Sequence, residues 1–363
     1  MCGIVGFTGK QNAAPILLEG LKKLEYRGYD SAGIAVCRDG VISVSKVSGR
    51  IVNLCEKTEN GTNIPGTSGI GHTRWATHGA PTDINAHPHT SCDGKFSIVH
   101  NGILENYLEL REELTAKGYA FRSQTDTEVI VHLLEMYYDG DLKSAVMKTT
   151  SRLEGSYAIG VLFADRPGTI MAVREASPLI LGIGVGESFF ASDVTALVAY
   201  TRNAVYLDDG EFAELTPERI TVYDCTGAAI QKLVSRITWS VEAAEKGGYE
   251  HFMLKEIMEQ PRSVKSALAP RIQDGGIRLD DFSFTEEDLL GIKKIVITAC
   301  GSAYYAGCAG KYAIETLCHI PVDVQLASEL RYGEPQIDSG TLLIGLGAHF
   351  VAKPAAVKAH IIA

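Results

Sequence analysis

A cysteine stands second in the chain, directly after the initiator methionine, in the stretch Met-Cys-Gly-Ile-Val-Gly. A thiol becomes a strong nucleophile when a base takes its proton. If Met1 is removed, the α-amine of Cys2 could be that base, because an α-amine has a reference pKa of roughly 7.7 to 8. The alternative is that Cys2 is a small apolar residue that begins a buried strand.

Four other residues could complete this chemistry. Arg74, in Gly-His-Thr-Arg-Trp-Ala-Thr-His-Gly, carries a guanidinium that can bind a carboxylate through two parallel hydrogen bonds. The amides of Asn101 and Gly102 could both donate to one oxyanion. Asp126 could hold an ammonium group. The alternatives are a surface arginine in a turn, an ordinary Asn-Gly turn and a carboxylate that caps a helix.

Four histidines lie close together in the sequence, at positions 72, 78, 87 and 89. They form no helical pair with a nearby Cys or Glu at ligand spacing, so we expect no metal. The eight cysteines lack CxxC spacing, which argues against a disulfide framework or a zinc knuckle. No cofactor is indicated.

Alternating apolar runs and turn residues predict the elements that must position these groups. Two helices are expected: one over residues 14–24, and one after Ser123, where Thr125 and Glu128 have capping-box spacing. Strand-rich sequence with interposed helices favours stacked sheets covered by helices, an α+β fold. The expected strands cover residues 4–7, 33–36, 41–47, 69–71, 96–100, 157–164, 170–174, 179–184, 189–192 and 211–215.

The pattern changes after about residue 220. A terminal hairpin is expected over residues 220–233, followed by a connector helix over 252–268 that is broken at Pro261. A separate α/β unit is expected to begin near Asp288. Its predicted elements are a helix over residues 304–317 and parallel strands over 295–298, 322–326 and 341–345.

Composition narrows the class of protein. The chain has 363 residues, 45% hydrophobic and 21% charged, as in ordinary globular proteins, and two domains are expected. A formal net charge of -10 argues against broad binding to nucleic acid or to an anionic membrane. There is neither an apolar run long enough to span a bilayer nor a signal-peptide pattern, so we expect a cytoplasmic protein.

Six ordered motifs between residues 2 and 129 carry a resemblance to a known family. The chain resembles the glutamine-fructose-6-phosphate aminotransferase (isomerizing) family, and its first half resembles the family's class II glutamine amidotransferase domain. The motifs are MCGIVG, LEYRGYDSAG, GHTRWATHG, NAHPH, HNGILEN and SQTDTEV.

The resemblance implies a fold and a set of domains. It implies a four-layer αββα N-terminal-nucleophile hydrolase domain over residues 2–220, and a hairpin and helical connector over 221–284. An incomplete α/β SIS (sugar isomerase) domain with a parallel sheet would follow over 285–363. The fold class is thus α+β.

The resemblance also implies roles for individual residues. Cys2 would attack the side-chain amide of L-glutamine to form a thioester, with Asn101 and Gly102 as the oxyanion hole. Arg74 would hold the α-carboxylate of glutamine and Asp126 its α-amine. The remaining glutamine-binding residues implied by the family are Trp75, which would also gate ammonia, Thr77, His78 and the supporting Arg27.

In the second domain, Cys300, Gly301 and Ser302 resemble the first loop of the SIS domain, where D-fructose 6-phosphate would bind. The family's product is D-glucosamine 6-phosphate. After about residue 345 the resemblance ends, and the sequence suggests a truncated or frameshifted product that retains only the glutaminase half. The alternative is a non-catalytic sugar-phosphate-binding or regulatory fragment. The family implies a homodimer formed through the SIS part.

Overall fold

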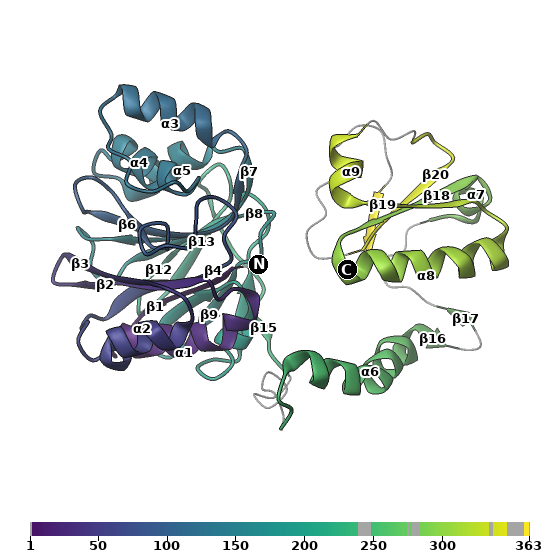
Figure 1. Ribbon diagram of the computed structural model, residues 1–363, viewed down its shortest axis with the longest axis horizontal. Helices are drawn as coiled ribbons and strands as arrows, with labels where there is room; N and C mark the ends of the chain where they lie inside the picture. The colour runs from purple at the N-terminus through teal and green to yellow at the C-terminus, as the bar shows by residue number, and fades with distance from the viewer. Residues whose placement is uncertain are drawn as a thin grey trace. The chain divides into compact units, whose positions relative to one another are not determined.

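Two antiparallel sheets form the framework of the first part of the chain. In the computed structural model, residues 2–238, 248–273, 276–277, 284–333, 337–346 and 359–362 are described. The chain divides into two units, Met1–His251 and Phe252–Ala363 (Figure 1). No helix among the described residues is long and apolar enough to cross a membrane.

The first sheet has eight strands in the order β15-β11-β9-β10-β1-β4-β2-β3, and every neighbouring pair is antiparallel. The N-terminal strand β1 lies in the interior of this sheet, between β10 and β4. The strands are β1 (Gly3–Thr8), β2 (Ser31–Arg38), β3 (Val41–Ser48), β4 (Ser68–Arg74), β9 (Ile180–Ile183), β10 (Ser188–Ala191), β11 (Asn203–Tyr206) and β15 (Ser235–Arg236).

The second sheet has seven strands in the order β14-β13-β12-β8-β7-β6-β5, again all antiparallel. Its strands are β5 (His89–Thr90), β6 (Phe96–Leu104), β7 (Gly155–Phe163), β8 (Ile170–Glu175), β12 (Phe212–Leu215), β13 (Ile220–Tyr223) and β14 (Ala229–Ile230).

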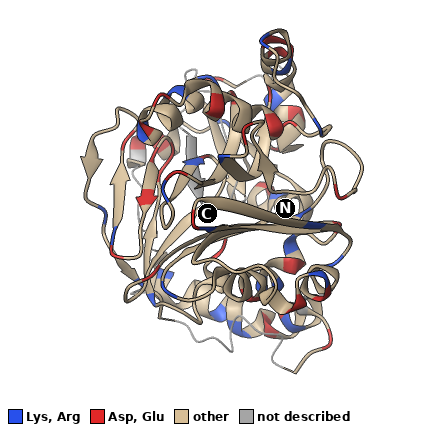
Figure 2. Cartoon of the chain, turned by 90° about the vertical axis from the view of Figure 1, so that its left-hand side faces the viewer, with Lys and Arg blue, Asp and Glu red and all other residues tan. Residues whose placement is uncertain are grey.

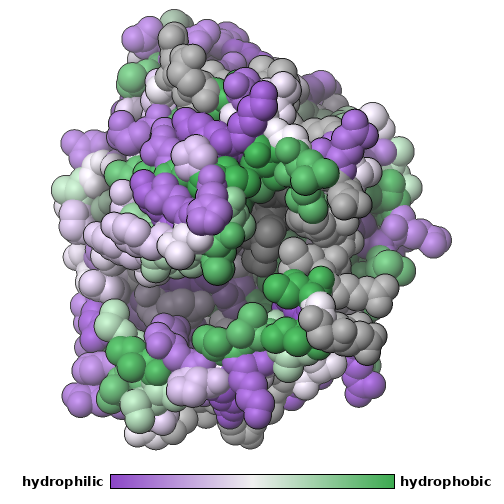
Figure 3. All heavy atoms as spheres, turned by 90° about the vertical axis from the view of Figure 1, so that its right-hand side faces the viewer, coloured by the Kyte–Doolittle hydropathy of each residue, from purple (hydrophilic) through white to green (hydrophobic). Residues whose placement is uncertain are grey.

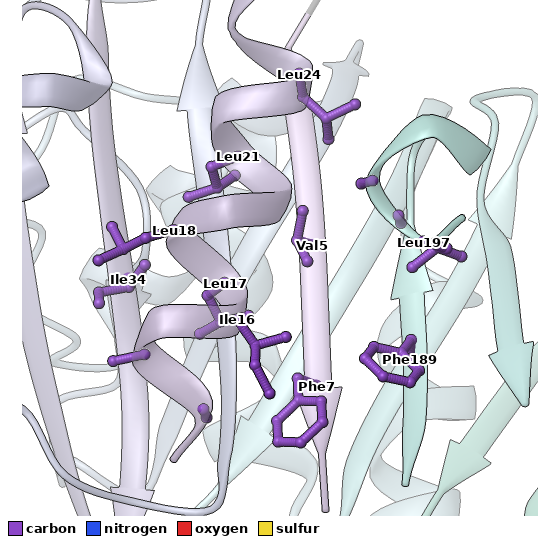
Figure 4. Close-up of a cluster of buried hydrophobic side chains, with 14 of the residues drawn as sticks. Val5, Phe7, Ile16, Leu17, Leu18, Leu21, Leu24, Ile34, Phe189 and Leu197 are labelled. Carbon is purple, nitrogen blue, oxygen red and sulfur yellow. The ribbon is translucent and has the colours of Figure 1, made fainter. Parts of the chain in front are cut away.

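Buried side chains join the two sheets to each other and to the helices. Successive residues of β1 point to opposite faces, so Ile4 joins the cluster that contains both sheets, while Val5 and Phe7 join the cluster under α1 (Ala13–Leu24). Figure 4 shows Leu17 and Leu21 of α1 facing β1 and the strand that carries Ile34. The predicted amphipathic helix over 14–24 is therefore confirmed.

Further helices cover the two sheets. Helix α2 (Ile51–Lys57) packs with α1 on the first sheet, and α3 (Tyr107–Ala116), α4 (Glu128–Tyr137) and α5 (Leu142–Thr150) pack with the second. Short 3-10 helices are η1 (Glu25–Arg27), η2 (Glu59–Gly61) and η3 (Val194–Ala196). Acidic and basic residues are interspersed over this unit (Figure 2).

The predicted capping box at the start of α4 is wrong. The Thr125 hydroxyl contacts Ser123 and His89, and the Glu128 carboxylate accepts hydrogen bonds from the backbone N–H groups of Arg122 and Ser123. The two side chains therefore tie the preceding loop together instead of capping the helix.

The second unit contains a small parallel sheet in the order β19-β18-β20-β21. Helix α6 continues through Pro261, so the predicted break is wrong. The α+β expectation is confirmed for the whole chain. The elements are α6 (Phe252–Leu268), η5 (Ala269–Arg271), β16 (Ile272–Gln273), β17 (Gly276–Ile277), α7 (Glu286–Leu290), β18 (Lys294–Ala299), α8 (Gly301–Cys318), β19 (Val322–Leu326), α9 (Ala327–Tyr332), β20 (Thr341–Leu346) and β21 (Ala359–Ile362).

Candidate active site

Cys2 is held at the end of the first sheet, beside β4. Strand β1 pairs with β4 in a register that sets Gly3 opposite Thr73, which brings Cys2 to the level of Arg74. The backbone N–H of Trp75 donates to the Cys2 Sγ at 3.2 Å. Burial raises the pKa of the Cys2 thiol, and this hydrogen bond lowers it in part. Formation of the thiolate therefore needs a base.

Asn101, on strand β6 of the second sheet, reaches across to Cys2. Its Nδ2 donates to the Cys2 carbonyl oxygen at 3.0 Å, and its Oδ1 lies 3.0 Å from the Nε2 of the buried His72. The Asn101 side-chain NH2 has two hydrogens, and only one is used by the Cys2 carbonyl. The other can donate to an oxyanion on a carbonyl group that the thiol attacks.

Gly102 follows in a conformation that favours glycine, with φ of 133°. A Cβ at this position would lie 1.9 Å from the Ser156 carbonyl oxygen on β7. Only glycine fits this close approach of the two strands.

Arg74 is buried, with 3% of its surface exposed, and organises the loop that follows it. Its guanidinium donates to the carbonyl of His78, and to those of Gly79 at 3.3 Å and Ala80 at 3.4 Å. Burial lowers the pKa of Arg74, with Asp30 as the main opposing charge. A cation that is taken out of water in this way favours an anionic ligand.

Asp126 lies just before α4 and is also buried. One of its carboxylate oxygens accepts a hydrogen bond from the backbone N–H of Leu104 at 3.0 Å, and the other lies 3.8 Å from the Nδ1 of His78. These contacts aim a carboxylate at the space beside Cys2.

A small pocket of about 20 Å3 joins these groups. Of the residues predicted for the site, Cys2, Arg74, Trp75, Thr77, Gly102 and Asp126 line it. Asn101 and His78 are not among the lining residues, but Asn101 contacts Cys2 and His78 contacts Asp126. A volume of this size admits about one water molecule.

Four lining residues were missed by sequence reasoning: His87, His100, Thr125 and Thr127. The signal was their position inside or next to three of the motifs. Burial lowers the pKa of His100, whose Nδ1 lies 2.9 Å from the Thr127 hydroxyl oxygen.

Arg27 lies outside the lining of this pocket. It forms an ion pair with Asp193, and the Tyr26 hydroxyl lies between them, 3.0 Å from the Arg27 Nε and 3.2 Å from the Asp193 carboxylate. The predicted supporting role of Arg27 stays a prediction.

Cys300, Gly301 and Ser302 lie in the second unit, at the start of α8. Cys300 is the N-cap residue, Gly301 has a left-handed φ of 59°, and all three residues are exposed. A Cβ on Gly301 would meet nothing within 4 Å.

A second pocket, of about 440 Å3, lies over β3 and the loop before β5. It is lined by Lys46, Lys57, Asp83, Arg122 and Glu128 among others, and burial lowers the pKa of Lys46 to about 8. It is larger than the Cys2 pocket, but the described residues that line it include no thiol, so the chemistry favours the smaller one.

The four histidines at positions 72, 78, 87 and 89, for which we expect no metal, are not part of the group of side chains that could share an ion. Among the described residues, the side chains close enough to share an ion are Cys92, His132 and Glu135, which lie away from the Cys2 pocket lining. His72 and His87 instead stack at 4.2 Å between ring centroids.

Comparison with known proteins gives two family matches. The model of the glutamine amidotransferase domain matches residues 57–252, and that of the SIS domain matches residues 288–356. Among solved structures, glutamine phosphoribosylpyrophosphate amidotransferase from B. subtilis is similar with a TM-score of 0.57. It is 20% identical and covers 89% of this chain and 65% of that one, a likeness of fold alone.

Two curated relatives are similar over most of this chain. Glutamine-fructose-6-phosphate aminotransferase [isomerizing] of Clostridium acetobutylicum is 54% identical over 347 residues, 95% of this chain and 57% of that protein. The protein of the same name from Pyrococcus horikoshii is 50% identical over 350 residues, again 95% and 57%. This chain therefore spans 57% of the length of these relatives. It belongs to the glutamine-fructose-6-phosphate aminotransferase family, with a glutamine amidotransferase domain followed by a SIS domain.

Proposed function

We propose that the first unit hydrolyses L-glutamine to L-glutamate and ammonia, as an N-terminal-nucleophile hydrolase with the four-layer αββα fold of that class. The observation that carries the proposal is the pocket in which the Cys2 thiol, the Arg74 guanidinium and the Asp126 carboxylate meet. A nucleophile between a cation and an anion suits an amino acid, whose carboxylate and ammonium groups carry the complementary charges.

The reaction begins after removal of Met1. The free α-amine of Cys2 takes the thiol proton, and the thiolate attacks the side-chain carbonyl carbon of glutamine. The oxyanion forms beside the second Nδ2 hydrogen of Asn101 and the backbone N–H of Gly102. The amine returns the proton to the leaving nitrogen as the C–N bond breaks, which releases ammonia and leaves a γ-glutamyl thioester. Water, deprotonated by the same amine, then releases glutamate.

Arg74 and Asp126 select the substrate. Arg74 binds the α-carboxylate and Asp126 the α-amine, so that the side-chain amide points at Cys2. Trp75, Thr77 and His78 close the pocket around the bound amino acid. Trp75, which is half exposed and contacts Tyr29 edge-on at 5.4 Å, is the proposed gate for the release of ammonia. Arg27 supports the turn nearby.

The ammonia serves the family's synthesis of D-glucosamine 6-phosphate from D-fructose 6-phosphate, the first step of amino-sugar formation, in the cytoplasm. Glutamine hydrolysis is the half of this function that we assign to the present polypeptide. Cys300, Gly301 and Ser302 are the proposed sugar-phosphate contacts, since the N-terminus of a long helix favours an anion.

The three proposed domains are an amidotransferase domain over residues 2–220, a connector over 221–284 and a SIS domain over 285–363. We propose that the SIS domain forms a homodimer. Its helix α8 exposes Tyr305, Tyr312 and Leu317 by 70% or more, and hydrophobic residues lie open on the face in Figure 3. Apolar side chains on one helix suit burial against a second copy.

The second candidate function is a sugar-phosphate-binding or regulatory fragment without catalysis. The exposed, left-handed Gly301 at the start of α8 favours it, because a backbone N–H in this conformation can face an anion.

The glutaminase is tested with the purified full chain and a Cys2→Ala variant. Wild type should release glutamate from glutamine and the variant should not, because no other thiol among the described residues lines the pocket. Cys225→Ala, at an exposed thiol elsewhere, is the matched control and should keep full activity. Equal glutamate release by Cys2→Ala and wild type would refute the nucleophile. Intact mass establishes whether Met1 is removed.

A further inference from the structure

A thiol, an imidazole and a carboxylate converge at a place that the glutaminase chemistry does not use. Cys92 lies in the turn between β5 and β6, and His132 and Glu135 lie one turn apart on α4. Their donor atoms all lie within 4.8 Å of one another. Cys92 is exposed, Glu135 is partly exposed and His132 is 1% exposed, so the cluster is open to solvent mainly on its thiol side.

Two of the three separations between the candidate ligand atoms are close to those around a tetrahedral ion. The His132 Nδ1 lies 3.8 Å from the Cys92 Sγ and 3.5 Å from a Glu135 oxygen. The Nδ1–oxygen separation exceeds a good N–H···O hydrogen bond, and the Nδ1–Sγ separation is that of a long hydrogen bond to sulfur. Ligands at about 2.3 Å for sulfur and about 2.0 to 2.1 Å for nitrogen and oxygen lie roughly 3.3 to 3.6 Å apart around a tetrahedral zinc ion.

The surroundings hold each ligand in place. The two Glu135 oxygens accept hydrogen bonds from the backbone N–H groups of Cys92 at 2.9 Å and Asp93 at 3.1 Å, which fixes the carboxylate beside the thiol. The His132 ring packs against Phe121, with ring centroids 4.8 Å apart.

The other ring nitrogen of His132 lies near the carboxylate of Glu128. Its Nε2 is buried without a hydrogen-bond partner, and the nearest Glu128 oxygen lies 3.7 Å away. Metal-bound histidines commonly turn their other ring nitrogen toward a carboxylate, which fixes the tautomer and strengthens the ligand. Glu128 offers that carboxylate here.

We propose that Cys92, His132 and Glu135 bind one divalent ion of the zinc class, with water as the fourth ligand. Thiolate and imidazole ligands select zinc over magnesium or calcium. The ion links the β5–β6 turn to α4 and therefore stabilises this part of the fold. Helix α4 begins two residues after Asp126. The proposal does not depend on the glutaminase assignment.

The test uses the metal alone, as Co2+, with the chelator-treated full chain. Wild type should bind one equivalent and develop a thiolate-to-cobalt charge-transfer band together with visible bands of tetrahedral intensity. Cys92→Ser should lose the charge-transfer band, and Glu135→Gln, which alters a direct ligand, should weaken binding by at least the roughly tenfold that loss of an outer-shell partner costs. Cys2→Ala and Cys225→Ser are the matched thiol controls. They should keep both the charge-transfer band and the wild-type affinity for Co2+. A band that survives in Cys92→Ser, or is absent from wild type, would overturn the site.

A second measurement needs no variant. Zn2+ should protect Cys92 of the wild-type chain from alkylation by iodoacetamide, as read by peptide mass mapping, while the exposed Cys225 stays reactive. Equal alkylation of Cys92 with and without Zn2+ would refute the proposal even if the substituted chains fail to fold.

Discussion

At the scale of single residues, Gly102 joins backbone geometry to the chemistry of the site. Its φ is 133°, and a Cβ there would lie only 1.9 Å from the Ser156 carbonyl oxygen, which leaves no room for a side chain. Asn101, its neighbour, holds the Cys2 carbonyl. A displacement of β6 at Gly102 therefore moves the amide that positions the nucleophile.

We expect Gly102→Ala to lower the free energy of unfolding by about 3 kcal/mol, since both strain and a steric clash act there. It should also lose most glutaminase activity. The control is Gly94→Ala, because Gly94 also has a positive φ, 74°, but its Cβ would meet nothing within 4 Å. That change should cost about 1 kcal/mol and leave activity unchanged. Urea unfolding and glutamate release measure both, and equal effects of the two substitutions would contradict the argument.

Residue types predicted some of the residues that line the pocket and missed others. Cys2, Arg74 and Asp126 are identifiable because a terminal thiol and opposite charges suggest a reaction. His87 and Thr127 are pocket residues only because strands of two sheets bring distant loops together. Loop side chains follow no periodic pattern, so the sequence alone does not predict which way they point.

At the scale of elements, buried histidines on one strand of each sheet make the first unit sensitive to acid. His72 lies on β4 and His89 on β5, and burial lowers the pKa of each to about 3. In the unfolded chain they titrate near pH 6.5. Below that pH the unfolded state binds more protons than the folded state, so stability falls as pH decreases toward 3.

We expect each of these histidines to remove about 1.4 kcal/mol of stability per pH unit between roughly pH 6 and pH 4. His89→Gln, which can still bond the Thr125 hydroxyl, should reduce the slope of unfolding free energy against pH by that amount. His251→Gln, at an exposed side chain, should leave the slope unchanged. Urea unfolding at several pH values measures the slopes, and identical slopes for wild type and His89→Gln would refute the assignment.

Local sequence patterns predicted the presence of helices better than the features that begin or break them. The apolar stripe of α1 is a property of the helix itself, so periodicity found it. The capping box failed because the hydroxyl of Thr125 is used by His89, a residue of another strand. Pro261 did not break α6, a case in which the helix tolerates the loss of one backbone hydrogen bond.

At the scale of the whole molecule, the candidate site depends on two sheets that the sequence cannot register against each other. Cys2 belongs to the end of one sheet and Asn101 to the other, 99 residues later. In the first sheet, β1 pairs with β10 between residues 180 to 186 positions apart, such as Thr8 with Ser188 and Val5 with Ala191. Such pairings follow from packing of the buried faces, which no local pattern encodes.

The proposed sugar-phosphate binding by the second unit depends on the turn at the start of α8. Cys300, Gly301 and Ser302 are exposed and offer neutral hydrogen-bond donors from one turn. Three neutral hydrogen bonds contribute about 1.5 to 4.5 kcal/mol together, which at most reaches the low end of the roughly 4 to 15 kcal/mol that association costs. Calorimetric titration of the full chain with D-fructose 6-phosphate should therefore show a Kd weaker than about 1 mM. Micromolar affinity that is lost in Ser302→Ala would contradict this and favour the sugar-phosphate-binding function, and glutamate release measured on the same preparation would show whether the glutaminase stands independently.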